Sequence, residues 1–172
     1  MIKLMGAVLL FFACSGLGFL QSRRCQGRVM QMGELIRIAG FLKGEISFAV
    51  STLPEAMERI SEKTENPFSD FLHILSEKMK RYSGENFSYI LKEQIDINLK
   101  DSFLEKEDLA DFYQAICNLG YLDKDMQIHI LDQYRKEQEE KVVRLRMQLP
   151  EKVKLCRSLG VMAGLFLVIL LI

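Results

Sequence analysis

Residues 32–57 read MGELIRIAGFLKGEISFAVSTLPEAM, and this stretch decides the fold. Its apolar positions recur every three or four residues, at Met32, Leu35, Ile38, Leu42, Ile46 and Ala49. This spacing places them on one face of a helix. Thr52-Leu53-Pro54-Glu55 then has the spacing of a capping box, with a proline in the first turn, where its missing N–H is not needed. One amphipathic helix is therefore predicted to be followed directly by a second, which runs to about Lys63.

The same reasoning predicts two further helices toward the C-terminus. Asn66-Pro67 opens the first of them, and Ser83-Gly84 ends it. Its buried stripe consists of Phe68, Phe71, Leu72, Leu75, Met79 and Tyr82. The next helix closes near Leu99, and its apolar positions are Phe87, Ile90, Leu91 and Ile95.

Two more helices complete the middle of the chain. Residues 105–119 repeat the helical pattern, and Gly120 suits the C-cap. Asp123 can cap a last helix that runs from about Lys124 past Arg146, until Pro150 kinks or interrupts it. Within that helix, Lys136–Glu140 and Glu137–Lys141 have the i,i+4 spacing of ion pairs on a solvated face. Nothing alternates convincingly at period two, so the predicted fold is all-α, an antiparallel bundle of about six helices.

The N-terminal stretch 4–20, LMGAVLLFFACSGLGFL, is uncharged and would cover about 25 Å as a helix, near the lower limit for crossing a bilayer. Only Lys3 precedes it, whereas Arg23, Arg24 and Arg28 follow it. Because positive charge is retained on the cytoplasmic side of a membrane, this pattern favours a retained anchor followed by a cytoplasmic domain. A signal peptide is the competing interpretation, and Cys14 would be the modified residue of a lipoprotein.

The C-terminal stretch 158–172, SLGVMAGLFLVILLI, follows Lys152, Lys154 and Arg157, so its basic flank also faces the middle of the chain. Its fully apolar part would cover about 21 Å, which is short of the roughly 30 Å of bilayer hydrocarbon, so complete crossing and partial insertion both stay open. Small residues offer a face for close helix contact in lipid. They are Gly160, Ala163 and Gly164 here and Gly6, Ala13 and Gly16 in the first segment.

The expected organisation is an N-terminal transmembrane helix over 1–22, a cytoplasmic helical bundle over 23–157 and a C-terminal hydrophobic membrane segment over 158–172. Every charge except Lys3 lies in 23–157, where 22 Lys and Arg face 23 Asp and Glu. This balance lacks the excess of positive charge that binding to a phosphate backbone requires. Nucleic acid is therefore excluded as an expected partner.

No motif of catalytic chemistry is present in the sequence. The phosphate-loop, dinucleotide-binding, nucleophile-elbow and HExxH patterns are all absent. The four cysteines are too far apart for a local zinc or CxxC site, and His73 and His129 have no clear ligand set. The pairs Asp108/Asp111 and Asp123/Asp125 are interpreted as helix-start or surface acids. We therefore expect no enzyme, no catalytic, cofactor-binding or metal-binding residue and no small-molecule substrate.

The order of these features resembles the stage III sporulation protein AB family. The apolar N-terminal stretch and the closing RSLGVMAGLFLVILLI carry part of the resemblance. In the middle, residues 42–57 are similar to the family's Leu, acid, Ile, aromatic and Thr-Leu-Pro pattern, and residues 109–130 to its Leu-Gly, Asp, Gln, Ile block. Here Leu119-Gly120, Asp123, Gln127 and Ile130 stand at the positions of that second block, and Leu122 departs from the small hydroxyl residue expected before Asp123.

The resemblance implies a function that composition could not show. Family members belong to a channel-like apparatus between mother cell and forespore, and the middle region is similar to the cytoplasmic domain of the secretion and pilus platform protein F. By that likeness the chain would be a scaffold that links a stage III sporulation protein AA-type ATPase to membrane ring components and that could assemble as a homo-oligomer. The charged helix over 124–146 is the hypothesis for the ATPase contact. A membrane-bound helical sensor and the lipoprotein modified at Cys14 are the alternatives.

Overall fold

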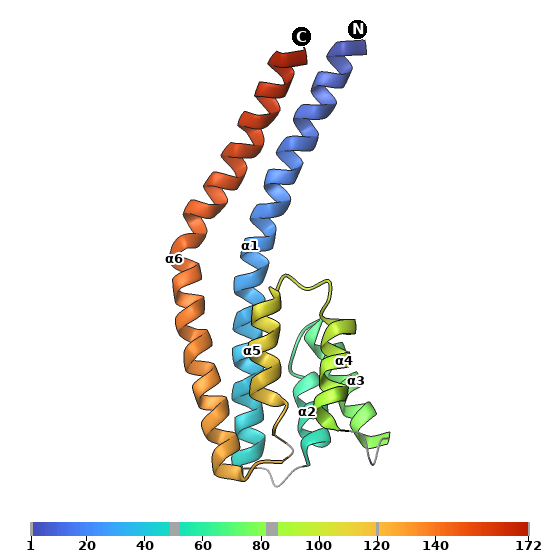
Figure 1. Cartoon of the computed structure of the whole chain (residues 1–172), viewed down its shortest axis with the longest axis vertical. Helices are drawn as coiled ribbons and strands as arrows, with labels where there is room; N and C mark the ends of the chain where they lie inside the picture. The colour runs from blue at the N-terminus through green and yellow to red at the C-terminus, as the bar shows by residue number, and fades with distance from the viewer. Residues whose placement is uncertain (1, 49–51, 82–85, 120, 172) are drawn as a thin grey trace. The chain divides into compact units, whose positions relative to one another are not determined.

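The computed structural model describes residues 2–48, 52–81, 86–119 and 121–171, and these ranges hold helices and short connections without a strand (Figure 1). The helices are α1 (Ile2–Phe48), α2 (Leu53–Ser61), α3 (Phe68–Arg81), α4 (Phe87–Asn98), α5 (Lys106–Ile116) and α6 (Lys124–Leu171). The prediction of an all-α fold is therefore confirmed. Among the described residues, no helix combines the length and the apolar character needed to cross a membrane.

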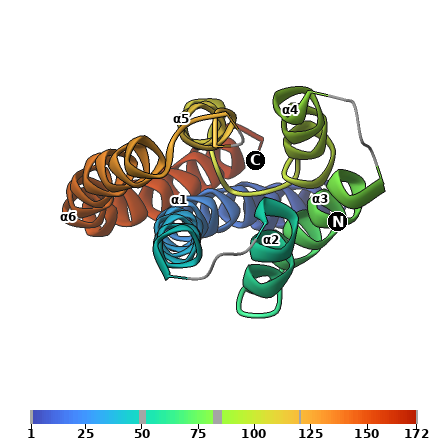
Figure 2. The same ribbon diagram turned by 90° about the horizontal axis from the view of Figure 1, so that it is seen from below.

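The chain divides into two compact units. Residues 30–142 form the bundle unit, and residues 1–29 and 143–172 form the helix-pair unit. The helices α1 and α6 contribute to both, whereas α2 to α5 belong to the bundle unit alone. Within the bundle unit, α3 packs against both α2 and α4 (Figure 2).

The core of the bundle unit is built from the apolar faces that the sequence predicts. Phe112 of α5 is fully buried, and its ring lies 6.3 Å from that of Phe71 and 6.1 Å from that of Tyr134, measured between centroids. Tilted rings at this separation are a favourable arrangement for aromatic side chains. The predicted stripe residues Leu35, Ile38, Leu42, Met57, Ile60, Phe68, Leu72, Leu75, Ile90, Leu91 and Ile116 belong to the same core.

Polar contacts join the long helices to each other and to the loops at the edge of this core. The ammonium group of Lys43 on α1 lies 2.6 Å from a carboxylate oxygen of Asp132 on α6. The backbone N–H of Phe103, between α4 and α5, donates to Oε1 of Gln31 on α1 at 2.7 Å. These contacts fix α1 against partners more than 70 residues away in the sequence.

Several predicted boundaries need correction. The anchor and the helix around Met32 were expected as separate elements, but α1 is one continuous helix because no residue between them breaks the backbone pattern. Pro150 lies inside α6 and does not interrupt it. Pro150 and Arg146 are both exposed, so the carbonyl of Arg146, which loses its amide partner, can be hydrated. The predicted ends at Ser83-Gly84 and Gly120 lie outside the described residues.

Candidate functional site

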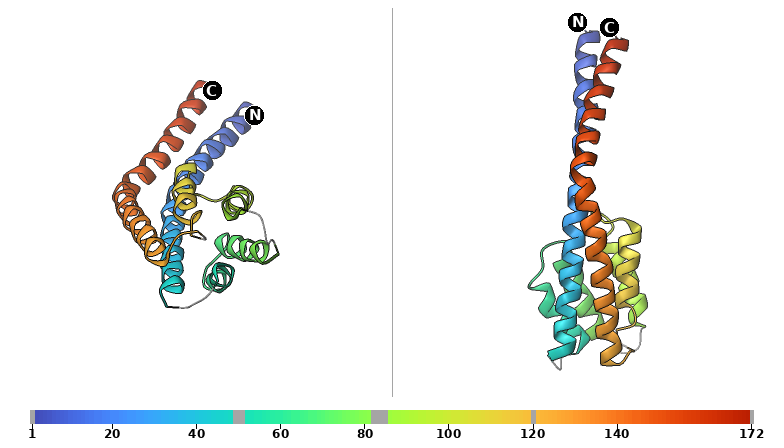
Figure 3. Two further views of the ribbon diagram at one scale, coloured as in Figure 1. Left: turned by 60° about the horizontal axis from the view of Figure 1, so that its bottom comes forward. Right: turned by 90° about the vertical axis from the view of Figure 1, so that its left-hand side faces the viewer.

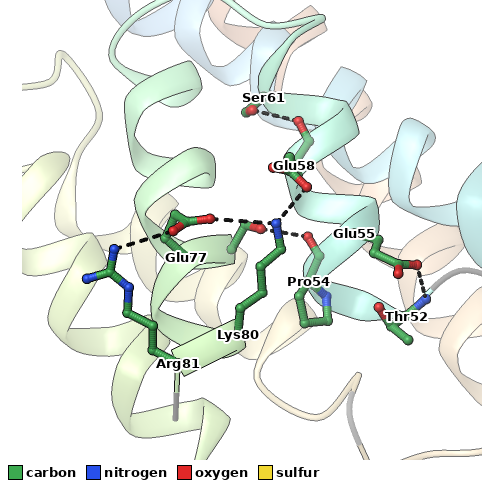
Figure 4. Close-up of polar contacts among 9 residues, drawn as sticks. Thr52, Pro54, Glu55, Glu58, Ser61, Glu77, Lys80 and Arg81 are labelled. Atoms are coloured by element: carbon green, nitrogen blue, oxygen red, sulfur yellow. Dashed lines mark hydrogen bonds and ion pairs between the residues drawn. The ribbon is translucent and has the colours of Figure 1, made fainter.

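Residues 52–57, the end of the stretch 42–57 that carries the family resemblance, begin α2 beside α3 (Figure 4). The backbone N–H of Thr52 donates to Oε2 of Glu55 at 3.2 Å, which is the back-bond of the predicted capping box. The carbonyl of Pro54 accepts a hydrogen bond of 2.8 Å from the hydroxyl of Ser76 on α3. The motif thus starts α2 and ties its first turn to the neighbouring helix.

A pair of opposite charges strengthens the same junction. The ammonium group of Lys80 on α3 lies 2.7 Å from Oε2 of Glu58 on α2 (Figure 4). The hydrogen bond from Lys80 lowers the pKa of the Glu58 carboxyl below its usual value. Both side chains are well exposed, so the pair adds little stability.

The second stretch of the resemblance builds the turn into α6. Oδ1 of Asp123 accepts from the backbone N–H of Met126 at 2.9 Å, so Asp123 caps the helix as predicted, despite Leu122. The side-chain amide of Gln127 donates to the carbonyl of Leu122 at 2.7 Å. Leu119 is buried in the core, and Ile130 packs against it. The residues of this block therefore shape the turn into α6 and anchor it to the core.

A network of acids around Lys141 joins α5 to α6 and was not predicted from the sequence. The ammonium group of Lys141 lies 2.9 Å from Oδ1 of Asp108 and 3.3 Å from Oδ2 of Asp111. Asp108 is 1% exposed, and its other oxygen accepts from the backbone N–H of Glu105 at 3.0 Å. The amide of Gln138 donates to Asp111 at 3.1 Å. The predicted Glu137–Lys141 pair is wrong, because Lys141 turns toward α5.

The network changes the ionisation of its members. Burial alone would lower the pKa of Lys141, but the hydrogen bonds and charges of Asp108 and Asp111 outweigh it and raise the pKa above the usual value. Burial, with the same two carboxylates nearby, raises the pKa of the Tyr134 hydroxyl well above its usual value. Lys141 is thus held as a cation and Tyr134 as a neutral phenol, which suits a structural network.

The predicted partner-contact segment forms one exposed stripe on α6, here called the outer face of α6. It consists of Met126, His129, Gln133, Lys136, Glu137 and Glu140, all exposed, and each lies three or four residues from another member. Oε1 of Glu137 accepts from the side chain of Gln133 at 3.0 Å. The neighbouring Glu139 lies 3.4 Å from Arg135. The stripe is therefore available at the surface and mixed in charge.

The histidines and the described cysteine side chains are scattered over the structure. His73 and His129 are both exposed, and no three His, Cys, Asp or Glu side chains among the described residues are placed to hold a metal ion. Cys25, Cys117 and Cys156 are free thiols, and burial raises the pKa of the Cys117 thiol, which lowers the fraction of reactive thiolate at neutral pH. The side chain of Cys14 lies outside the described part of the chain.

In the helix-pair unit, α1 and α6 run side by side (Figure 3), and their backbones come close together at a glycine. A Cβ added at Gly18 would lie 2.6 Å from the carbonyl oxygen of Cys156 and 3.3 Å from Cα of Gly160. A Cβ added at Gly6 or at Gly16 would have no such neighbour within 4 Å. The predicted small-residue contact therefore involves Gly160, but its partner on α1 is Gly18 in place of Gly6 and Gly16.

The surface of the helix-pair unit is apolar over much of its length. Leu17, Leu159 and Phe166 are 67%, 61% and 65% exposed. The ring of Phe19 makes cation–π contacts with two arginines. The guanidinium carbon of Arg23 lies 5.3 Å from the ring centroid, and the guanidinium carbon of Arg157 lies 5.6 Å from the same centroid. The unit thus combines exposed apolar side chains with a group of arginines.

Comparison with known proteins identifies a family. The sequence model described as "Stage III sporulation protein AB" matches residues 3–172. Among solved structures, the chain is similar to a protein described as "Stage III sporulation protein AB (SpoIIIAB)", with a TM-score of 0.64 and 16% identity over 72% of this chain and 96% of that chain. At this identity, the likeness concerns the fold. A search of curated proteins finds no match.

Proposed function

The chain belongs to the stage III sporulation protein AB family, and on that premise we propose that it is a non-enzymatic, membrane-anchored scaffold of the apparatus that joins mother cell and forespore. The helix-pair unit holds the protein in the mother-cell membrane around the forespore, and the bundle unit lies in the cytoplasm. There the bundle connects a stage III sporulation protein AA-type ATPase to the membrane ring components.

The observation that carries this proposal is the contrast in surface between the two units. Exposed large apolar side chains such as Leu17, Leu159 and Phe166 are unfavourable in water and suit hydrocarbon. Positive charge is concentrated beside them, at Arg23, Arg24 and in 152–157, which favours retention of this flank on the cytoplasmic side. The anchor and its orientation are supported by these two features together.

The outer face of α6 is the proposed contact for the ATPase. Its side chains are exposed along one stripe, whereas Lys141 and Gln138, which lie beside the stripe on the same helix, are engaged with α5. A mixed stripe of Lys136, Glu137 and Glu140 can pair with complementary charges of a partner. Substitutions on this stripe therefore leave the contacts to α5 in place.

The test is co-purification of the ATPase with the full-length protein from membranes. The variant Glu137→Lys/Glu140→Lys should lose the ATPase, because reversal places repulsive charge at the contact. A matched control is Glu62→Lys/Glu65→Lys, which reverses two exposed acids between α2 and α3. Unchanged ATPase recovery with the α6 variant, at equal protein level, would refute this surface, and equal loss with both variants would indicate a charge effect without a defined site.

A further inference from the structure

We propose that Phe19, Arg23 and Arg157 form a binding site for the phosphate of an anionic phospholipid headgroup. The three residues come from the two helices of the helix-pair unit and are called the arginine clamp. The proposal rests on the proposed function in one respect, which is that this unit lies in a membrane. It adds to that function a specific lipid ligand at a defined place.

The clamp lies next to a close approach of the two helix backbones. Gly18 leaves so little room that a Cβ would meet the carbonyl oxygen of Cys156. Phe19 follows Gly18 in the sequence and Arg157 follows Cys156, so the backbone contact brings these two side chains together. Arg23 lies one helical turn beyond Phe19 on α1 and completes the set. Two guanidinium groups are thereby held close to one ring.

The clamp lacks a negative partner within the described part of the protein. Neither Arg23 nor Arg157 forms an ion pair there, and each makes a contact with Phe19. Residues 1–29 contain no Asp or Glu, and residues 143–172 contain only Glu151. The unit carries nine Lys or Arg and one acid, a net charge of +8. Two arginines held together without an acid are complementary to an anion, and guanidinium groups match phosphate oxygens in pairs.

The surroundings of the clamp favour a lipid over a free phosphate. Leu20 and Leu155, which lie within three residues of the clamp, are 58% and 57% exposed. Acyl chains attached to the phosphate can cover such side chains, whereas inorganic phosphate cannot. Arg24, Lys152 and Lys154 are exposed beside the clamp and add to the attraction toward an anionic leaflet. Charge and apolar exposure therefore point to the same ligand.

The experiment uses the full-length protein in nanodiscs that contain equal amounts of phosphatidylcholine and phosphatidylglycerol. Native mass spectrometry after release counts the lipids that stay bound. Wild-type protein should retain phosphatidylglycerol in excess of the bulk ratio, and Arg23→Gln/Arg157→Gln should return to that ratio. The matched control, Arg24→Gln/Arg146→Gln, removes the same charge away from Phe19 and should keep most of the enrichment. Phe19→Leu should lose part of it, because the ring that orients both arginines is gone.

Each contrary outcome has a distinct meaning. Equal retention of both lipids by the wild type, or equal loss in the clamp and control variants, would overturn the site. Release of the lipid by glycerol phosphate alone would identify a free phosphate ester as the ligand and would also overturn it. Failure of the wild type to enter nanodiscs would refute the proposed membrane anchor itself. Helix content by circular dichroism checks that the variants fold. The ratio of the two lipids bound to the wild-type protein tests selective binding of the anionic lipid without any variant.

Discussion

The bundle unit and the helix-pair unit are both made of helices, yet they are held together in opposite ways. In the bundle unit, large side chains such as Phe71 and Phe112 are fully buried. In the helix-pair unit, the two backbones lie close together at Gly18 and Cys156, and large side chains such as Phe166 are exposed. Close backbone approach at small residues is typical of helices that associate in lipid, where burying apolar side chains gains little.

The charges of the two units differ as sharply. The bundle unit carries 14 Lys or Arg and 22 Asp or Glu, a net charge of −8, against +8 for the helix-pair unit. The zero net charge of the whole chain conceals this division. A surface that is apolar and basic suits an anionic membrane, and a surface that is polar and acidic suits water and basic partners. The comparison thus supports separate environments for the two units.

The largest expected effect is the loss of the central ring of the bundle core. Phe112→Ala removes a fully buried side chain that contacts Phe71 and Tyr134, and should lower the free energy of unfolding by about 3–5 kcal/mol. Urea unfolding of the full-length protein in detergent, followed by circular dichroism, measures it. Tyr89→Ala is the control, because Tyr89 is 67% exposed and its loss should change stability by less than about 0.5 kcal/mol. Similar losses in both variants would contradict the core described here.

A second prediction concerns the charged network of the bundle unit. Asp108→Asn leaves Lys141 without its nearest carboxylate and should cost about 3 kcal/mol, the low end for a buried pair because Lys141 keeps some exposure. Glu107→Gln is the matched control, since Glu107 lies 3.6 Å from the same ammonium group but is 73% exposed. Its cost should stay below about 0.5 kcal/mol. The same urea titration compares the two, and equal costs would place the network at the surface.

A third prediction concerns the close backbone contact in the helix-pair unit. Gly18→Leu forces apart the backbones at Cys156 and Gly160, at a cost of about 1–3 kcal/mol. Spin labels at Gln21 and Leu155, both exposed, should report a longer and broader distance in this variant. Gly16→Leu should leave the distance unchanged, because nothing lies within 4 Å of its Cβ position. A shift with Gly16→Leu alone would mean that the opposite face of α1 makes the contact.

The smallest expected effect is on pH dependence. The raised pKa of Lys141 contributes stability that is complete below the unfolded value of 10.5 and is lost as the pH rises through the folded pKa. Bundle stability should therefore fall above pH 10.5. Lys141→Arg, which stays charged there, should make the fall shallower. Tyr134→Phe removes the contribution of the phenol to the same pH dependence. Urea unfolding at several pH values measures it, and an identical fall of stability with pH in the wild type and Lys141→Arg would exclude a role for Lys141.

The sequence alone predicts the local features of this fold well. Spacing identifies the buried faces, as at Leu35 and Leu72, because helical periodicity is a local property. The caps at Thr52 and Asp123 follow equally from nearby residues. The continuity of α1 across the boundary expected after residue 22 was not predicted.

Features that depend on packing between distant segments could not be predicted in the same way. The Lys141 network requires the relative rotation of α5 and α6, which periodicity does not define, and the i,i+4 rule favoured Glu137 for that reason. The choice of Gly18 over Gly16 likewise depends on which face of α1 meets α6. The exposed arginine pair on Phe19 becomes visible only after that contact is known.

The central claim, that the helix-pair unit anchors a cytoplasmic bundle unit, is tested most directly by cysteine labelling in intact cells. The protein is expressed in a non-sporulating cell with its four cysteines replaced by Ser, and carries either Tyr89→Cys in the bundle unit or a cysteine inserted after Met1. A membrane-impermeant maleimide is then added before or after lysis. The account predicts that the N-terminal cysteine reacts in intact cells and that Tyr89→Cys reacts only after lysis. Reaction of Tyr89→Cys in intact cells would place the bundle unit outside and would contradict the account.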